Sequence, residues 1–425
     1  MLPTLYLSSS GPGPQDARCG PCARKTPVAG APSSSVAQKS EPQFEKLDVL
    51  GRARTPSCTN AAATLHILED SGVPNASTNY TTLVVIHGYT WHSGIFSKLV
   101  PFAKDRNARV ILVNRRDYPG ARPFTQEERA LLPSLPTEEA ASATEIAEAT
   151  QKIDVFMKER AREVYDLLAE LVNNEDLPPF QRESNTGGII VAGWSFGTVW
   201  ITALLAHAAS FATNGVDLSA YMRRLVFFDP SYHLLGYLPP ATSGYHPLLD
   251  PELTPDTIDQ VFARWVSGYY DHGAILETLE QKTPAQDPPP TISALTPEEV
   301  VRAQYLPPGT PGGSDALLFQ SGRKLGLFKT LKERALYLPS PGAPSETAGN
   351  TWSEVEVCFT WCLRSTWDTT WGAWALKKEL EDAEQKSVAI RRVRMMRIRG
   401  ANHFVSWDQP EKAFRALVGD EDDVQ

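Results

Sequence analysis

Ser195 lies in a segment whose residue types suit nucleophilic catalysis. The segment 193–197 (GWSFG) has the form G-x-S-x-G and separates an apolar run at 188–192 from a second one at 199–207. A short apolar strand, this turn and a helix together predict a nucleophile elbow, which holds a serine hydroxyl at the carboxyl end of the strand. Glycine suits both flanks because a Cβ there would clash where strand and helix approach each other. The alternative is an ordinary glycine-rich turn.

His403 is the candidate base for this serine. A serine hydroxyl is a weak nucleophile until a neighbouring imidazole removes its proton. Among eight histidines, His403 follows the last apolar run, 393–398, within the segment 400–404 (GANHF). That place predicts a loop at the carboxyl edge of a sheet, from which His403 can reach Ser195. A hydrogen-bonded structural histidine is the alternative, and we expect His246 to be structural or on the surface.

Alternating strands and helices must position these side chains. Besides the elbow strand, we expect strands at 63–68, 82–86, 109–114, 225–228, 355–361 and 393–398. Helices are expected at 138–173, 199–207, 370–384 and 410–417. This alternation predicts the α/β class, with a doubly wound, mostly parallel sheet that is covered on both faces and carries its site at the carboxyl ends of the strands.

Four segments of different character follow one another along the chain. Residues 1–44 are rich in Gly, Pro, Ser and Ala and predict a disordered tail. Residues 45–230 predict the first part of the α/β core, and residues 351–425 its second part. Between them, residues 231–350 are dense in proline and lack β-rich runs, and their helices begin at clear caps such as Thr254 and Thr296. We interpret this segment as a helical cap over the sheet, with a third helix at 314–336.

Composition narrows the partners and the compartment. The chain has 425 residues, of which 42% are hydrophobic, enough for a sizeable core. A net charge of -9 argues against nucleic acid and acidic membrane surfaces as partners. No apolar run approaches the roughly 20 residues that cross a bilayer. An amino terminus without a leading positive charge and an odd number of cysteines, five, favour a cytoplasmic protein. An organelle-targeting function of the tail is the alternative.

Four motifs in the right order resemble the α/β-hydrolase superfamily. They are HGY at 87–89, RDYPG at 116–120, the elbow at 193–197 and GANH at 400–403. The resemblance covers about residues 60–420 and points to the serine hydrolase branch with a helical cap. It implies an eight-stranded-type sheet, the chain order serine, acid, histidine, and no cofactor or metal.

The same resemblance implies a carboxylate that holds the tautomer of His403. The family usually places it after the strand before the histidine strand, where Asp368 lies between 355–361 and the helix at 370–384. Some members take it from the strand after the elbow, which ends here in Asp229. We favour Asp368 and keep Asp229 as the alternative; as structural residues, either would cap a helix or a turn.

Further site residues follow from the resemblance or from composition. The resemblance places the oxyanion hole at the N–H groups of Tyr89 and Phe196. Trp194 flanks the serine, and two cap aromatics, Trp265 and Tyr269, could line an apolar pocket. The alternative for the cap aromatics is packing within the cap.

We therefore predict a cofactor-free serine hydrolase that cleaves a carboxylic ester, or a related acyl bond, of a small to medium apolar molecule through an acyl-enzyme. Amidases or peptidases, acyltransferases and carbon–carbon hydrolases with the same triad are alternatives. Epoxide hydrolases and dehalogenases of the superfamily use an aspartate nucleophile, so Ser195 argues against both. A non-catalytic binding protein with this fold is the alternative from another functional class.

Overall fold

The strands form a single mixed sheet in the part of the chain that the computed structural model describes. This part comprises residues 63–75, 77–134, 142–175, 177–213, 215–240, 244–338, 351–419, 421 and 423–424, and the predicted tail of residues 1–44 lies outside it. The order is β1-β3-β2-β4-β5-β6-β7-β8. The strands are β1 His66–Asp70, β2 Thr81–Ile86, β3 Ala108–Asn114, β4 Ile189–Trp194, β5 Met222–Phe228, β6 Glu356–Cys362, β7 Val393–Ile398 and β8 Asp423–Val424.

The pairing confirms the predicted mostly parallel sheet. Only β1, at the edge, pairs antiparallel, with β3, and all the other described pairs are parallel. The central strands β2, β3, β4 and β5 are buried along their whole length. Such strands are continuous apolar runs because both of their faces are covered.

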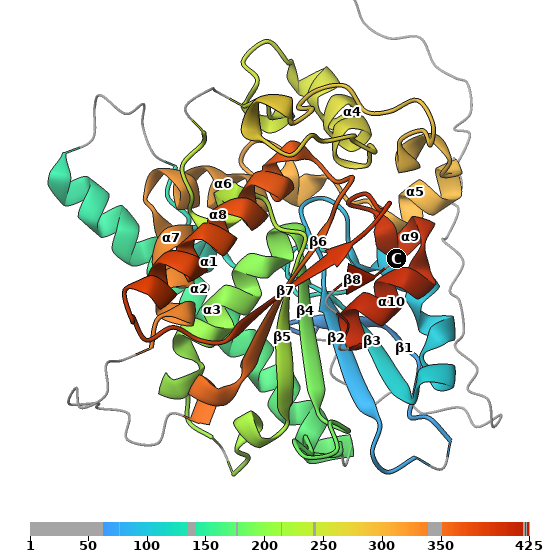
Figure 1. Ribbon diagram of the computed structural model, residues 1–425. Coiled ribbons are helices and arrows are strands. Elements are labelled where there is room, and N and C mark those ends of the chain that lie inside the picture. Colours follow the sequence, from blue (N-terminus) through green and yellow to red (C-terminus); the bar gives the residue numbers. More distant parts are fainter. Residues whose placement is uncertain are drawn as a thin grey trace, which may run out of the picture. The chain divides into compact units, whose positions relative to one another are not determined.

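Helices cover the two faces of the sheet. Val84 and Ile86 of β2 pack into one hydrophobic cluster, and their neighbours Leu83 and Val85 into the other. The first cluster includes residues of α2 (Ala143–Glu175), α3 (Thr198–His207) and α8 (Trp367–Gln385). The second includes residues of the 3-10 helix Ser93–Phe102, of α9 (Val405–Asp408) and of α10 (Pro410–Val418). In Figure 1, α3 and α8 lie on one side of the strands and α9 and α10 on the other.

The described residues between β5 and β6 form helices and no strand. They are α4 (Pro255–Val266), α5 (Pro297–Ala303), α6 (Ser314–Lys324) and α7 (Leu327–Leu336). The predicted cap of α5 is present: the Thr296 hydroxyl accepts from the Glu299 N–H, and the Glu299 carboxylate accepts from the Thr296 N–H. The single helix predicted at 314–336 is wrong. Gly326 adopts a left-handed conformation (φ 69°) that ends one helix and begins the next.

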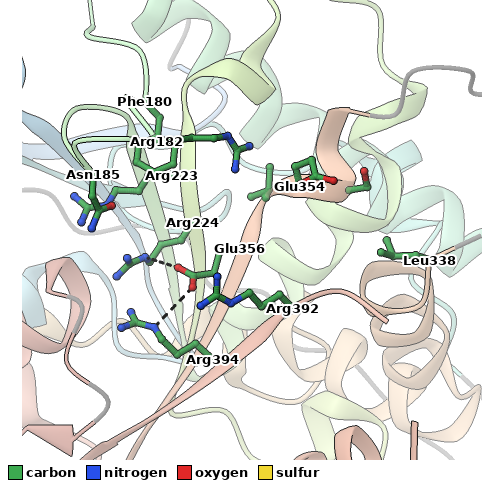
Figure 2. A pocket seen from close by; sticks show the side chains of 12 residues that line it. Phe180, Arg182, Asn185, Arg223, Arg224, Leu338, Glu354, Glu356, Arg392 and Arg394 are labelled. Carbon is green, nitrogen blue, oxygen red and sulfur yellow. Dashed lines mark ion pairs between the residues drawn. The ribbon is translucent and has the colours of Figure 1, made fainter. Parts of the chain in front are cut away.

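An arginine-lined hollow lies at the amino ends of β5, β6 and β7 (Figure 2). It measures about 680 Å³ and is lined by five arginines and two glutamates, Arg182, Arg223, Arg224, Arg392, Arg394, Glu354 and Glu356. Glu356 lies between two of them, 3.2 Å from Arg224 Nε and 3.9 Å from Arg394 Nε. Because the parallel strands run away from this end, the hollow is at the opposite end of the sheet from Ser195.

Candidate active site

Ser195 lies at a sharp turn between β4 and α3. Its φ is 52°, a left-handed value that side chains other than glycine rarely adopt. The flanking glycines leave the necessary space, since a Cβ on Gly193 would lie 2.5 Å from the Gly197 carbonyl oxygen and one on Gly197 2.5 Å from the Ile86 carbonyl oxygen. The turn therefore has the tight strand-to-helix geometry that the GWSFG segment predicts.

His403 and Asp229 meet beside this turn. In the β4–β5 register Trp194 pairs with Phe228, so Ser195 and Asp229 follow neighbouring residues of adjacent strands. His403 follows β7, and its Nδ1 lies 2.6 Å from Asp229 Oδ2. The ring of His403 stacks on that of Trp194, with centroids 4.7 Å apart, and the Trp194 Nε1–H donates to the His403 carbonyl oxygen (3.1 Å). Both the side chain and the backbone of His403 are thus held.

The surroundings of Asp229 determine which nitrogen of His403 carries the proton. Asp229 is fully buried, and its carboxylate also accepts from the Cys362 N–H (2.9 Å) and the Ser365 hydroxyl (2.6 Å). An ionised carboxylate only accepts hydrogen bonds, so Nδ1 of His403 donates. The unprotonated Nε2 is then the nitrogen available to a proton from Ser195. Asp229 itself has a left-handed backbone (φ 52°), a second strained residue at the ends of these strands.

The preference for Asp368 as the partner of His403 is wrong in this structure. Asp368 occupies the second position of α8, which begins at Trp367 after the N-cap Thr366. It is Ser365, three residues earlier, that reaches Asp229, and the start of the helix turns the chain before Asp368. Asp229, the alternative, holds the position beside His403. Asp368 instead lines the cavity next to Ser195, and burial is the main cause that raises its pKa to about 6.

The loop that carries Tyr89 is tied down by a buried ion pair. The Arg115 guanidinium binds both carboxylate oxygens of Asp315 in α6, at 2.9 and 2.6 Å. It also donates to the carbonyl oxygens of His87 (3.2 Å) and Gly88 (2.8 Å). No hydrogen bond in the described part of the chain uses the Tyr89 N–H. Arg115 and Asp315 thus connect this loop to the helical segment.

A narrow cavity of about 40 Å³ lies beside Ser195 and His403. Ser195, His403 and Asp368 line it together with mostly apolar side chains from the loop, the elbow and the helical segment: Tyr89, Phe196, Leu234, Leu248, Phe262, Trp265, Val266 and Phe319. This volume holds roughly three water molecules, so the cavity as it stands admits only a small group.

The predicted pocket residues divide into one that lines the cavity and two that do not. Trp265 lines it, and its Nε1–H donates to the Gln281 carbonyl oxygen (2.8 Å). Trp194 packs against His403, and the Tyr269 hydroxyl turns away to donate to Asp408 (2.6 Å). His246, which we expected to be structural or on the surface, also lines the cavity. Its proline-rich segment has no periodicity that could have indicated this.

No metal site and no membrane-spanning helix is found in the described ranges. No group of three or more His, Cys, Asp or Glu side chains there is placed to hold a metal ion. None of the helices there combines the length and the apolar character that crossing a bilayer requires.

Comparison with known proteins identifies the family. Solved structures that match include the peroxisomal alpha-beta-hydrolase Lpx1 of Saccharomyces cerevisiae (11% identity, 81% of this chain and 78% of that chain, TM-score 0.39). Another is a monoacylglycerol lipase of Paleococcus ferrophilus (14% identity, 83% of this chain and 96% of that chain, TM-score 0.37). A third is epoxide hydrolase I of potato, Solanum tuberosum (11% identity, 83% of this chain and 96% of that chain, TM-score 0.38). A search of curated proteins finds no match. The model of the alpha/beta hydrolase family matches residues 83–417, and the chain therefore belongs to this family.

Proposed function

We propose that this protein is a serine hydrolase that cleaves a carboxylic ester of a small, largely apolar molecule. The observation that carries the proposal is that Ser195 and His403 line one largely apolar cavity while Asp229 is hydrogen-bonded to His403. Ser195 is half-buried, so its hydroxyl remains accessible from the cavity, whereas the imidazole and the carboxylate behind it are shielded from water.

The reaction follows from these positions. Ser195 Oγ attacks the ester carbonyl while its proton passes to Nε2 of His403, and Asp229 stabilises the imidazolium that forms. The protonated imidazole then gives its proton to the leaving alcohol, which leaves an acyl group on Ser195. In the second half water attacks the acyl-enzyme while His403 accepts its proton. The bond between the acyl carbon and Ser195 Oγ then breaks, the imidazolium returns the proton to Oγ, and the acid product is released.

The developing oxyanion needs two donors. The N–H groups of Tyr89 and Phe196 are our candidates. The Tyr89 N–H has no acceptor in the described residues, and Phe196 lies in the first turn after β4, where backbone N–H groups lack intrahelical partners. Removing one such donor typically costs about 3–4 kcal/mol of transition-state stabilisation.

We further propose that residues 231–350 act as the cap of this site. Phe262 and Trp265 of α4 and Phe319 of α6 line the cavity from that segment. The Tyr89 hydroxyl donates to the Gly309 carbonyl oxygen (2.6 Å), which connects the segment to the loop beside Ser195. A substrate larger than the present cavity requires these side chains to move.

A fluorophosphonate probe tests the proposal because it reacts with activated serines. We expect labelling of the purified protein that disappears in Ser195→Ala and persists in Ser210→Ala, a matched change at an exposed serine. A panel of esters and amides of graded size then identifies the bond cleaved. A folded protein that is neither labelled nor active on any member would contradict the proposal and favour a binding protein.

A further inference from the structure

Asp368 lines the proposed substrate cavity and has one carboxylate oxygen without a hydrogen-bond partner. Its side chain is 3% exposed, and its Oδ1 is buried without a hydrogen bond. The carboxylate does accept hydrogen bonds from the Thr366 side chain and the Thr369 backbone, which leaves Oδ1 as its unpartnered atom. Burying a polar atom without a partner is costly, and such atoms are rare in folded proteins. A carboxylate whose only role was to stabilise the first turn of α8 could lie on the exposed surface of that helix. Asp368 instead lines the cavity with Ser195 and His403.

His246 provides a second polar group on the same cavity. Its Nδ1 accepts from the Leu248 N–H (3.2 Å), so the single ring proton of the neutral imidazole lies on Nε2. Burial lowers the pKa of His246 to about 3, which keeps the ring neutral at pH 7. Nε2 lies 3.8 Å from Asp368 Oδ2, beyond the length of a hydrogen bond. A donor and an acceptor therefore lie near each other without satisfying each other.

A hydroxyl group has the chemistry that matches this pair. It donates one hydrogen bond, to the Asp368 carboxylate, and accepts another, from Nε2–H of His246. An ammonium group could only donate, and would leave the His246 N–H facing a cation. A carboxylate group would be repelled by Asp368. An alkyl group would leave Oδ1 of Asp368 and the Nε2–H of His246 without partners.

Building on the proposed hydrolase activity, we propose that Asp368 and His246 form a polar subsite that binds a hydroxyl group of the substrate, so the preferred substrates are hydroxylated esters. The remaining lining, including Phe262, Trp265 and Phe319, binds the apolar part of the molecule. Asp368 is a specificity residue in this scheme, and Asp229 keeps the role of orienting His403.

Matched pairs of esters test the subsite. Each pair has an alkyl ester and its ω-hydroxy counterpart of equal chain length, with the hydroxyl on the acyl side in one series and on the alcohol side in another. We expect the hydroxyl to raise kcat/KM by about 10- to 100-fold at one chain length, the range for a hydrogen bond to a charged group. In Asp368→Leu the ratio of kcat/KM for the hydroxylated ester to that for its alkyl counterpart should fall to about one. Asp368→Asn keeps an acceptor oxygen and should retain part of this ratio.

A matched control variant tests whether the loss of hydroxyl preference is specific to Asp368. Asp271→Leu makes the same change at a carboxylate that is 77% exposed and paired with Arg364, and the ratio should persist. Equal kcat/KM values within every pair for the wild type would overturn the subsite, as would a ratio that survives in Asp368→Leu. If Asp368→Leu does not fold, the wild type and Asp368→Asn still decide.

The two proposals can fail separately. A protein labelled by fluorophosphonate that does not discriminate within the pairs would refute the subsite and leave the hydrolase. If no ester is cleaved, calorimetry of short diols against alkanols of equal length measures the subsite directly. Tighter binding of the diol that is lost in Asp368→Leu and only reduced in Asp368→Asn would then support a hydroxyl site in a binding protein, and equal binding would overturn it.

Discussion

The buried pair of Arg115 and Asp315 allows stability and activity to be separated. The side chain of Arg115 is 2% exposed and that of Asp315 4%, and two hydrogen bonds join them. Asp315→Asn removes the negative charge and keeps the shape. The guanidinium, which remains protonated, is then buried without a counter-charge. We expect the free energy of unfolding to fall by about 3–5 kcal/mol, the typical cost of breaking a buried ion pair from one side.

Replacing both partners should return most of that loss. In Arg115→Met/Asp315→Leu no charge is buried, and replacing such pairs by apolar residues is often neutral or stabilising. The carbonyl oxygens of His87 and Gly88 lose their donor, however, and the Tyr118 hydroxyl loses its acceptor, at a combined cost of about 2 kcal/mol. The double variant should therefore unfold about 2 kcal/mol more easily than the wild type, and be more stable than Asp315→Asn.

Activity should not follow stability in this series. Arg115 holds the two carbonyl groups that precede the Tyr89 N–H, so its loss frees the proposed oxyanion donor to move. An oxyanion donor contributes about 3–4 kcal/mol, and losing even part of that lowers kcat by at least about ten-fold. The double variant should therefore remain at least ten-fold less active although its stability is largely restored.

Urea unfolding followed by tryptophan fluorescence gives the stabilities, and turnover of an activated ester under folded conditions gives kcat. A fall of less than about 1 kcal/mol in Asp315→Asn would refute the electrostatic reasoning, because it would mean that water or movement compensates the charge. A double variant that regains both stability and kcat would refute the positioning role of Arg115.

Three other predictions follow from the site and the hollow. Asp229→Asn should lower kcat by about four orders of magnitude because His403 loses its tautomer control; an effect of that size in Asp368→Asn and not in Asp229→Asn would contradict the assignment. Burial raises the pKa of Asp368 from the ordinary 3.8 to about 6 in the folded protein, so its contribution to stability is present below about pH 4 and lost as the pH rises through 6. The free energy of unfolding of Asp368→Asn relative to the wild type, from urea titrations, should rise by about 2 kcal/mol between pH 4 and pH 7, and no change with pH would contradict the burial argument. Glu356→Gln should lower the melting temperature most at low salt, because it removes the carboxylate between Arg224 and Arg394; equal melting temperatures of variant and wild type in low salt would contradict this.

Much of the site was predictable because its signals are local. Gly193 is required by a contact within a single turn, where a Cβ would meet the Gly197 carbonyl oxygen, and the turn is encoded by five consecutive residues. Gly197 is required by the neighbouring strand, where a Cβ would meet the Ile86 carbonyl oxygen. His403 could be placed because parallel strands bring their following loops to one edge. The break at Gly326 was missed, since the apolar spacing of 314–336 continues across it and only the backbone conformation of the glycine interrupts the helix.

The sequence by itself determined the alternation of strands and helices, the elbow with Ser195 and the loop with His403, because periodicity and short turns depend on neighbouring residues. Only the tertiary structure decided between Asp229 and Asp368, since both follow strands and only the placement of Ser365 and the start of α8 brings one of them to His403. It also decided that His246 lines the cavity and Tyr269 does not. Contacts between distant segments depend on packing geometry, which no local pattern records.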